Sequence, residues 1–372
     1  MEANLMKITR LSIYEVGLTS HIRYAMSDGK VCDTVPSVIV KLETDGGVSG
    51  WGEVCPIPHY LEAYAGGVAP AIENMAPVLL GGDALASDAL MDRANQHLLG
   101  HVYAKSAVSM ALWDVLGKAA GMPLYQLLGG RQQETMPLYH SITCVAPDEM
   151  ARIAKEAYAT GIRQFQVKLG ADQDNEADIA RLRLVRDAVG PGPLVYGDWN
   201  CGATQLNAIR VGRAVRDLDV MLEQPCATLE ECAAVRQATG LAMKIDENGH
   251  DTASLLQAYE HGCLDAVALK ISKFGGIHEM RRSRDLCCHL GAMMCIEDTW
   301  GSDITTAAVL HIGAATPARY LLNVCDLSGY VGPRLDPAAP QRQDGRIAPP
   351  EAAGLGVAPD EDVLGSPIAV FD

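Results

Sequence analysis

A repeated alternation of strands and helices between residues 137 and 326 is the feature that most restricts the fold of this chain. Eight apolar segments of strand length recur there, followed by turns and by segments with helical spacing, such as 147–160 and 276–290. This pattern predicts a parallel (β/α) barrel with about seven helices. An open doubly wound sheet is the alternative, but it usually has fewer strands, and no GxGxxG follows the first one. The predicted strands are PLYHSITC, QFQVK, PLVYGD, DVMLE, LAMKID, AVALK, GAMMCIED and YLLNVCD.

The residues on both sides of this region follow other patterns. Three strands come first, the last two joined by Asp45-Gly46-Gly47, and three helical segments follow them. This order predicts a small α+β domain built on an antiparallel meander. The strands are expected at 6–18, 36–43 and 48–53, and the helices at 69–80, 87–99 and 104–120. The predicted division is an α+β capping domain at 1–130, a catalytic barrel at 131–335, and a segment at 336–372 that returns to the capping domain.

The formal charge of −16 and the scattered cysteines limit the partners and the compartment of the protein. Nucleic acids and anionic membranes require basic patches, so we expect neither as a partner. No apolar run approaches membrane-spanning length, and no secretory pattern begins the chain. The eleven cysteines lack a paired CxxC framework, which is typical of reduced core residues in a cytoplasmic protein.

An ionisable residue stands at the C-terminal end of each of six successive predicted strands. The intervals between them are 23 to 30 residues, each about one strand–helix unit. Because the carboxyl ends of parallel barrel strands meet at one mouth, these side chains are predicted to share an active site. The six residues are Lys168, Asp198, Glu223, Asp246, Lys270 and Asp298.

The three adjacent carboxylates Asp198, Glu223 and Asp246 predict a metal site. Carboxylates without histidine or thiolate suit a hard cation, and Mg²⁺, one per subunit, is the natural candidate. N-capping of the helix after each strand is the alternative for any one of these residues. It explains poorly why the neighbouring strands end in lysines.

Lys168 and Lys270 are predicted to be catalytic. Strands two and six lie on opposite sides of a barrel, so the two lysines would face one another across a bound substrate. A lysine beside a cation and another lysine has its ammonium form disfavoured, and it can then act as a base. The arrangement suits removal of a proton next to a carboxylate, with the metal stabilising the resulting enediolate.

The motifs at these positions resemble those of the enolase superfamily, specifically its muconate-lactonizing-enzyme-like branch. The segments GDWN (197–200), LEQP (222–225) and DEN (246–248) are similar to its three metal-ligand motifs. LKISKFGG (269–276) resembles its strand-six lysine motif, and Lys168 matches the second lysine of its K-x-K motif. Two positions distinguish this chain. Gln166 replaces the first lysine of that motif, and Asp298 stands where a related branch has a catalytic histidine.

Finer similarities point to members of the family that act on proline derivatives. They lie in GDWNCG, EQPC, IEDTWGSDI and the loop DGKVCDT. Asp298 and Trp300 would offer a carboxylate and an indole face to a cationic ring. Packing against the strand-seven loop is the equal alternative for Trp300. Loops of the capping domain, including Tyr60, are expected to close over the mouth. The predicted substrate contacts are Gln166, Asn200, Asp298, Thr299, Trp300 and Tyr60.

The resemblance implies a magnesium-dependent dehydration of cis-3-hydroxy-L-proline to Δ1-pyrroline-2-carboxylate. The hydroxyl of this substrate lies opposite the α-hydrogen, so two opposed lysines suit anti elimination. They suit 2-epimerisation of proline or hydroxyproline betaine equally well, which stays the alternative. A non-catalytic binding protein would not need the lysine pair, and a metal-dependent hydrolase would more typically have histidine ligands. The expected partner is a small amino acid, and the protein is expected to form a homo-oligomer.

Overall fold

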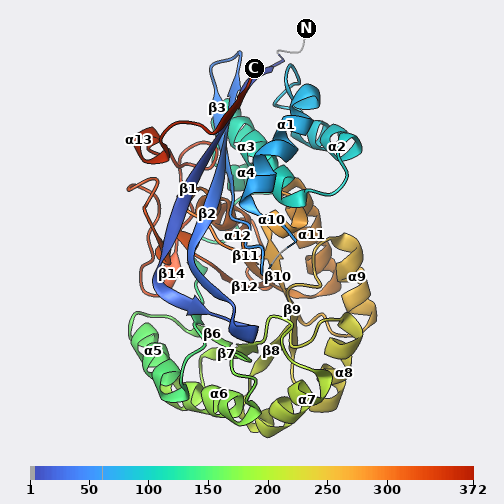
Figure 1. Ribbon diagram of the computed structural model, residues 1–372, viewed down its shortest axis with the longest axis vertical. Helices are drawn as coiled ribbons and strands as arrows, with labels where there is room; N and C mark the ends of the chain where they lie inside the picture. Colours follow the sequence, from blue (N-terminus) through green and yellow to red (C-terminus); the bar gives the residue numbers. More distant parts are fainter. Residues whose placement is uncertain (1–4, 61) are drawn as a thin grey trace.

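The computed structural model describes residues 5–60 and 62–372. Two sheets organise these residues (Figure 1). A five-stranded sheet lies near the two ends of the chain, and an eight-stranded sheet forms the centre of the larger part. The small sheet contains β1 (Ile8–Ala25), β2 (Val31–Thr44), β3 (Ser49–Val54), β13 (Val331–Gly332) and β15 (Ala369–Phe371).

The eight-stranded sheet is parallel and follows chain order, so each strand pairs with its sequence neighbours. A bridge between Leu138 and Val324 joins its first and last segments. The predicted (β/α) barrel is therefore confirmed. Its strands are β5 (His140–Ile142), β6 (Gln164–Lys168), β7 (Leu194–Asp198), β8 (Met221–Glu223), β9 (Met243–Ile245), β10 (Ala266–Lys270), β11 (Met293–Glu297) and β12 (Leu321–Val324).

Helices cover the outside of this sheet, and Figure 1 shows α5 to α9 as an arc around it. Their apolar faces are buried in one core cluster with apolar side chains of the strands, such as Phe165 and Val167 of β6. The helices are α5 (Pro147–Ala159), α6 (Asn175–Val189), α7 (Gln205–Ala214), α8 (Leu229–Thr239), α9 (Thr252–Glu260), α10 (Ile271–Phe274), α11 (Ile277–Leu290) and α12 (Asp303–Ala314).

The antiparallel sheet packs on α3, and glycines make their close contact possible. A Cβ added to Gly50 would lie 2.1 Å from the carbonyl oxygen of Ala111, and one added to Gly52 would lie 1.9 Å from that of Ala107. No larger residue fits at either position. The helices of this part are α1 (Val68–Leu79), α2 (Ser87–His97) and α3 (Val102–Ala120).

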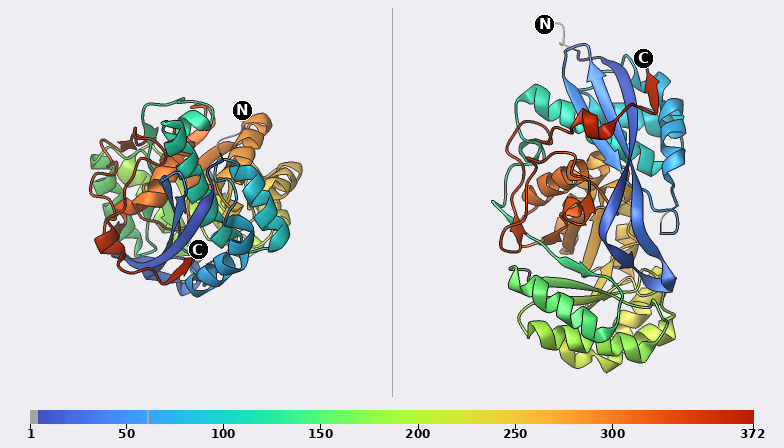
Figure 2. Two further views of the ribbon diagram at one scale, coloured as in Figure 1. Left: turned by 90° about the horizontal axis from the view of Figure 1, so that it is seen from above. Right: turned by 60° about the vertical axis from the view of Figure 1, so that its left-hand side comes forward.

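The hairpin of β1 and β2 leaves this sheet and extends to the barrel, as both Figure 1 and the right-hand view of Figure 2 show. Its lower end is attached to the segment after β5. The backbone N–H of Ala25 donates to Oγ1 of Thr143 at 2.7 Å, and the Ala25 carbonyl accepts from the N–H of Cys144. Residues of the hairpin therefore lie beside the carboxyl ends of the barrel strands.

The end of the chain also contacts the first sheet. β15 pairs antiparallel with β1, with Phe371 opposite Leu11. Earlier in the tail, the N–H of Leu355 donates to Asp114 of α3 at 2.7 Å. The segment after Asp336 thus returns to the N-terminal part, while the exact domain boundaries stay a prediction.

Glu53 of β3 connects the two parts through a completely buried carboxylate. Its oxygens accept hydrogen bonds from the backbone N–H groups of Ser302 and Thr305 and from the hydroxyls of the same two residues, at 2.7–3.1 Å. Ser37 donates a further bond at 2.6 Å. A carboxylate from the first sheet therefore satisfies the free N–H groups at the start of barrel helix α12.

Within the described ranges, no helix is long and apolar enough to cross a membrane. All eleven cysteines are free thiols.

Candidate active site

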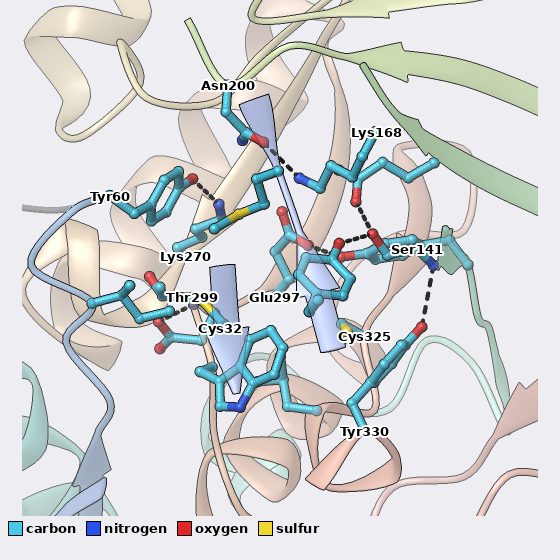
Figure 3. Close-up of a pocket in the computed structure, with 18 residues that line it drawn as sticks. Cys32, Tyr60, Ser141, Lys168, Asn200, Lys270, Glu297, Thr299, Cys325 and Tyr330 are labelled. Atoms are coloured by element: carbon cyan, nitrogen blue, oxygen red, sulfur yellow. Dashed lines mark hydrogen bonds between the residues drawn. The ribbon is translucent and has the colours of Figure 1, made fainter. Parts of the chain in front are cut away.

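A pocket lies at the carboxyl ends of the barrel strands, closed on one side by the β1–β2 hairpin and the segment after β3 (Figure 3). Side chains from both parts of the chain line it. The residues of the hairpin and of the segment after β3 are Tyr24, Met26, Cys32, Ile57 and Tyr60. The sequence-predicted residues that line it are Gln166, Lys168, Asn200, Lys270, Asp298, Thr299, Trp300 and Tyr60.

Lys168 reaches the pocket from the last position of β6 and is buried. Its Nζ lies 2.5 Å from Oδ2 of Asp198 and 2.9 Å from Oδ1 of Asn200. Burial lowers the pKa of the ammonium, but Asp198, Tyr24 and Glu223 together raise it by more, so the pKa is raised overall. Pairing with a carboxylate favours the charged form. The sequence expectation concerned a lysine beside a bound cation, and it stays a prediction.

Lys270 reaches the same pocket from the last position of β10, which is separated from β6 by three strands. Its Nζ lies 2.6 Å from Oδ2 of Asp246 and 2.6 Å from the hydroxyl of Tyr60, which itself donates to Asp246. Burial again lowers the pKa of the ammonium, and Asp246 and other carboxylates raise it by more. The two lysines thus approach one pocket from opposite sides (Figure 3), each beside a carboxylate.

Asp198 and Glu223 end β7 and β8 side by side, and Asp246 directly follows β9. All three are buried, and the amide of Gln166 joins two of them, donating to Asp198 at 3.0 Å and to Glu223 at 2.8 Å. N-capping does not account for them. The capping oxygens of the three following helices come from Thr204, Thr228 and Asp251.

The chemistry of this donor set fits a magnesium ion. Burial raises the pKa of Glu223 to about 7, against the effect of Lys244 and with that of the neighbouring carboxylates. Its Oε1 accepts no hydrogen bond, although Nζ of Lys244 lies 2.8 Å away. In the part of the chain that is described, no three acidic, histidine or cysteine side chains converge as a ready metal site. A cation shared by the three carboxylates would therefore displace some of their lysine and amide contacts.

The residues after β11 differ in part from the sequence interpretation. The strand ends at Glu297, and Asp298 follows it. Both oxygens of Asp298 accept hydrogen bonds from protein groups, namely Ser272 and the N–H of Thr299. Burial raises the pKa of Asp298 to about 6. Its predicted contact with substrate stays a prediction.

Trp300 packs against the protein and also lines the pocket, so its contact with substrate stays a prediction. It is 8% exposed and contacts Tyr24 edge-on, with ring centroids 5.5 Å apart, yet it also lines the pocket. Among the described residues, its Nε1 and Oγ1 of Thr299 are buried without hydrogen-bond partners.

Several pocket residues were missed by the sequence interpretation. Glu297 accepts a hydrogen bond from Tyr139 beneath the pocket, and Nζ of Lys244 lies 4.0 Å from the same carboxylate. Period-two alternation would have found two of them, since Lys244 and Asp246 share one strand face, as do Cys295 and Glu297. Ser141 had no local signal, because its bond to Tyr24 joins two separate parts of the chain.

Comparisons with known proteins agree with this geometry. Residues 149–363 match the family model described as enolase C-terminal domain-like. Residues 8–129 match the mandelate racemase / muconate lactonizing enzyme N-terminal domain. The chain belongs to the enolase superfamily, as its motifs predicted, and it is an enzyme of that superfamily.

The relatives of this chain catalyse different reactions. The chain is 39% identical over 368 residues to the cis-3-hydroxy-L-proline dehydratase of Roseibium aggregatum, covering 98% of this chain and 100% of that protein. It is 27% identical to the N-succinyl-L-Arg/Lys racemase of Bacillus cereus, covering 96% and 97% of the two chains. A crystal structure of an enolase-superfamily member from Roseovarius nubinhibens ISM, complexed with magnesium, superposes with a TM-score of 0.93. That chain is 36% identical, and 99% of this chain and 100% of that one are covered.

Proposed function

We propose that the protein dehydrates cis-3-hydroxy-L-proline to Δ1-pyrroline-2-carboxylate. The observation that carries the proposal is the pair of lysines, Lys168 and Lys270, which enter one buried pocket from opposite barrel strands. The full-length similarity to a dehydratase of this substrate supports the choice of substrate.

The chemistry assigned to the lysines is an anti elimination. One lysine, as the free amine, takes the α-proton, and the C–H electron pair forms the new double bond to C3. The C3–O bond breaks on the opposite ring face, and the ammonium of the other lysine donates the proton with which the hydroxyl leaves as water. The enamine then tautomerises to the cyclic imine.

Asp198, Glu223 and Asp246 would hold the magnesium ion. When bound, it would anchor the substrate carboxylate, offset the negative charge that develops there, and offset the carboxylate charges that raise the pKa of the lysines. Gln166 contributes no charge of its own and orients two of these carboxylates. Asn200 accepts from Lys168, and Tyr60 accepts from Lys270, so each ammonium has a neutral partner as well as a carboxylate.

The remaining pocket residues would recognise the ring of the substrate. The indole of Trp300 and the carboxylates of Glu297 and Asp298 line the same pocket, which suits a cyclic ammonium. The unpartnered Thr299 hydroxyl would bond the polar groups of the substrate. Cytoplasmic location and a homo-oligomeric state belong to the same proposal.

A 2-epimerase of proline or hydroxyproline betaine is the second candidate. The same lysine pair serves it, because one lysine can remove the α-proton and the other can return a proton to the opposite face. The similarity to a racemase of acylated amino acids supports this alternative.

The product formed with Mg²⁺ from the cis and trans isomers of 3-hydroxy-L-proline tests the proposal. We expect the cis isomer to yield the cyclic imine, and the trans isomer, whose hydroxyl lies on the same face as the α-hydrogen, to react much more slowly. Equal rates for the two isomers, or a product that keeps its hydroxyl with C2 inverted, would contradict dehydration. Inversion would support the epimerase.

A further inference from the structure

Lys270 occupies a helix N-cap position, but its side chain cannot accept the hydrogen bond that an N-cap side chain usually accepts. It is the N-cap of the short helix α10, with extended backbone angles (φ −106°, ψ 121°). An N-cap side chain normally accepts a hydrogen bond from the N–H group two or three residues later. The side chain of Lys270 is a donor and is directed to Asp246 and Tyr60 instead.

Asp298 supplies the missing acceptor from the adjacent strand. Its Oδ2 accepts from the N–H of Ser272, two residues after Lys270, at 3.0 Å. Its Oδ1 accepts from the hydroxyl of Ser272 and from the N–H of Thr299. Asp298 therefore links the first turn of α10 to the loop after β11. All of these groups are buried or nearly so, so water does not readily replace the bonds.

The same turn carries a second ammonium that touches Asp246. Nζ of Lys273 donates to Oδ1 of Asp246 at 2.8 Å and also to its backbone carbonyl. The turn of α10 thus sets the positions of Lys270 and Lys273 relative to one carboxylate. Lys168, on β6, makes no contact with this turn. Its bonds go to Asp198 and Asn200.

We infer that Asp298 is a positioning residue for Lys270: it caps the turn after the lysine and fixes where the ammonium lies in the pocket. The inference deepens the proposed function and rests on it, since it assigns to Asp298 an effect on one of the two proton-transfer faces. Ser272 is the group through which Asp298 acts. Direct binding of the substrate nitrogen by Asp298 would instead affect both faces alike.

The test measures deuterium exchange at the α-carbon of L-proline and D-proline in D₂O with the magnesium-loaded enzyme. Proline lacks the hydroxyl, so exchange reports proton transfer without elimination. Lys168→Ala and Lys270→Ala first assign one lysine to each enantiomer. Asp298→Ala is then expected to reduce exchange of the enantiomer assigned to Lys270 by about tenfold or more, relative to the other.

Four further variants separate positioning from other roles. Ser272→Ala removes the hydroxyl bond to Oδ1 of Asp298 and keeps the N–H bond to Oδ2, so it should show a smaller loss with the same selectivity. The double variant should be little worse than Asp298→Ala, because the acceptor of both bonds is already absent there. Asp298→Asn keeps one acceptor and should recover part of the exchange. Asp114→Ala removes a different buried carboxylate that also accepts two backbone N–H groups, and it should lower stability without changing the ratio.

An equal loss of both enantiomers in Asp298→Ala, with Ser272→Ala unaffected, would overturn the inference in favour of direct substrate binding. If Asp298→Ala does not fold, Ser272→Ala decides the same question. The wild type could exchange only one enantiomer. If Lys270 is the lysine assigned to it, Asp298→Ala should lose that exchange. If Lys168 is the assigned lysine, Asp298→Ala should change the exchange little. Exchange of neither enantiomer by the wild type would contradict the proposed function and not the capping role.

Discussion

The buried carboxylates of two regions of this molecule are satisfied in different ways. At the contact between the first sheet and the barrel, Glu53 accepts bonds only from neutral donors, most of them on Ser302 and Thr305. At the barrel mouth, Asp198 and Asp246 are paired with lysines. Glu223 there lies 2.8 Å from Nζ of Lys244, although its Oε1 has no hydrogen-bond partner among the described residues.

The difference shows what each region is built to do. Neutral donors fixed on a helix N-terminus stabilise a permanent negative charge, and they are not exchanged for other partners. Carboxylates held by mobile ammonium groups can exchange those partners for a cation and a substrate. Burial alone therefore does not distinguish Glu53 from the carboxylates of the mouth, whereas their partners differ.

Removal of magnesium should cause the largest loss of activity, and it should affect the barrel mouth without changing the rest of the fold. Dialysis against a chelator is expected to abolish turnover of cis-3-hydroxy-L-proline, and added Mg²⁺ should restore it, with an unchanged circular dichroism spectrum throughout. Asp246→Asn should weaken Mg²⁺ binding measured by calorimetry, while Asp114→Asn, at a buried structural carboxylate, should not. Full turnover after chelation would show that the mouth carboxylates do not hold a metal ion that the reaction requires.

Replacement of either lysine should have the next largest effect. Lys168→Ala and Lys270→Ala are each expected to lower kcat by about 10²–10⁴-fold, because each removes one proton-transfer step. Steady-state kinetics measures this, and thermal unfolding checks that both variants are folded at the assay temperature. A variant with unchanged kcat would show that its lysine only neutralises a carboxylate.

Glu53→Ala should lower the free energy of unfolding by about 3 kcal/mol, since it leaves the N–H groups of Ser302 and Thr305 buried without acceptors. Denaturant unfolding followed by fluorescence measures the loss. Mg²⁺ affinity of the folded variant should stay close to that of the wild type. A large loss of Mg²⁺ affinity with unchanged stability would show that Glu53 supports metal binding and not the stability of the fold.

Trp300→Leu should have the smallest of these effects, raising KM by roughly 30-fold, which corresponds to a desolvated cation–π contact of about 2 kcal/mol. Trp113→Leu serves as the matched control, because Trp113 is a buried tryptophan outside the pocket. The control should lose stability and keep its KM. If the two variants behave alike, Trp300 acts by packing.

The sequence by itself determined the barrel, because period-two and helical patterns recur at intervals that only a succession of strand–helix units produces. It also placed Lys168 and Lys270 at opposite strands and three carboxylates between them, since strand ends of a parallel barrel share one mouth. These inferences needed only positions along the chain and the direction of the strands.

Only the tertiary structure decided what each of these groups touches. Sequence patterns do not give the contact of Asp298 with Ser272, 26 residues away, or that of Glu53 with Thr305, 252 residues away. Such bonds depend on how separate elements meet, and the cost of leaving a buried polar group unpaired selects among the possible partners. The pKa of a lysine likewise depends on which carboxylates lie beside it, and Asp198 raises that of Lys168 as Asp246 raises that of Lys270.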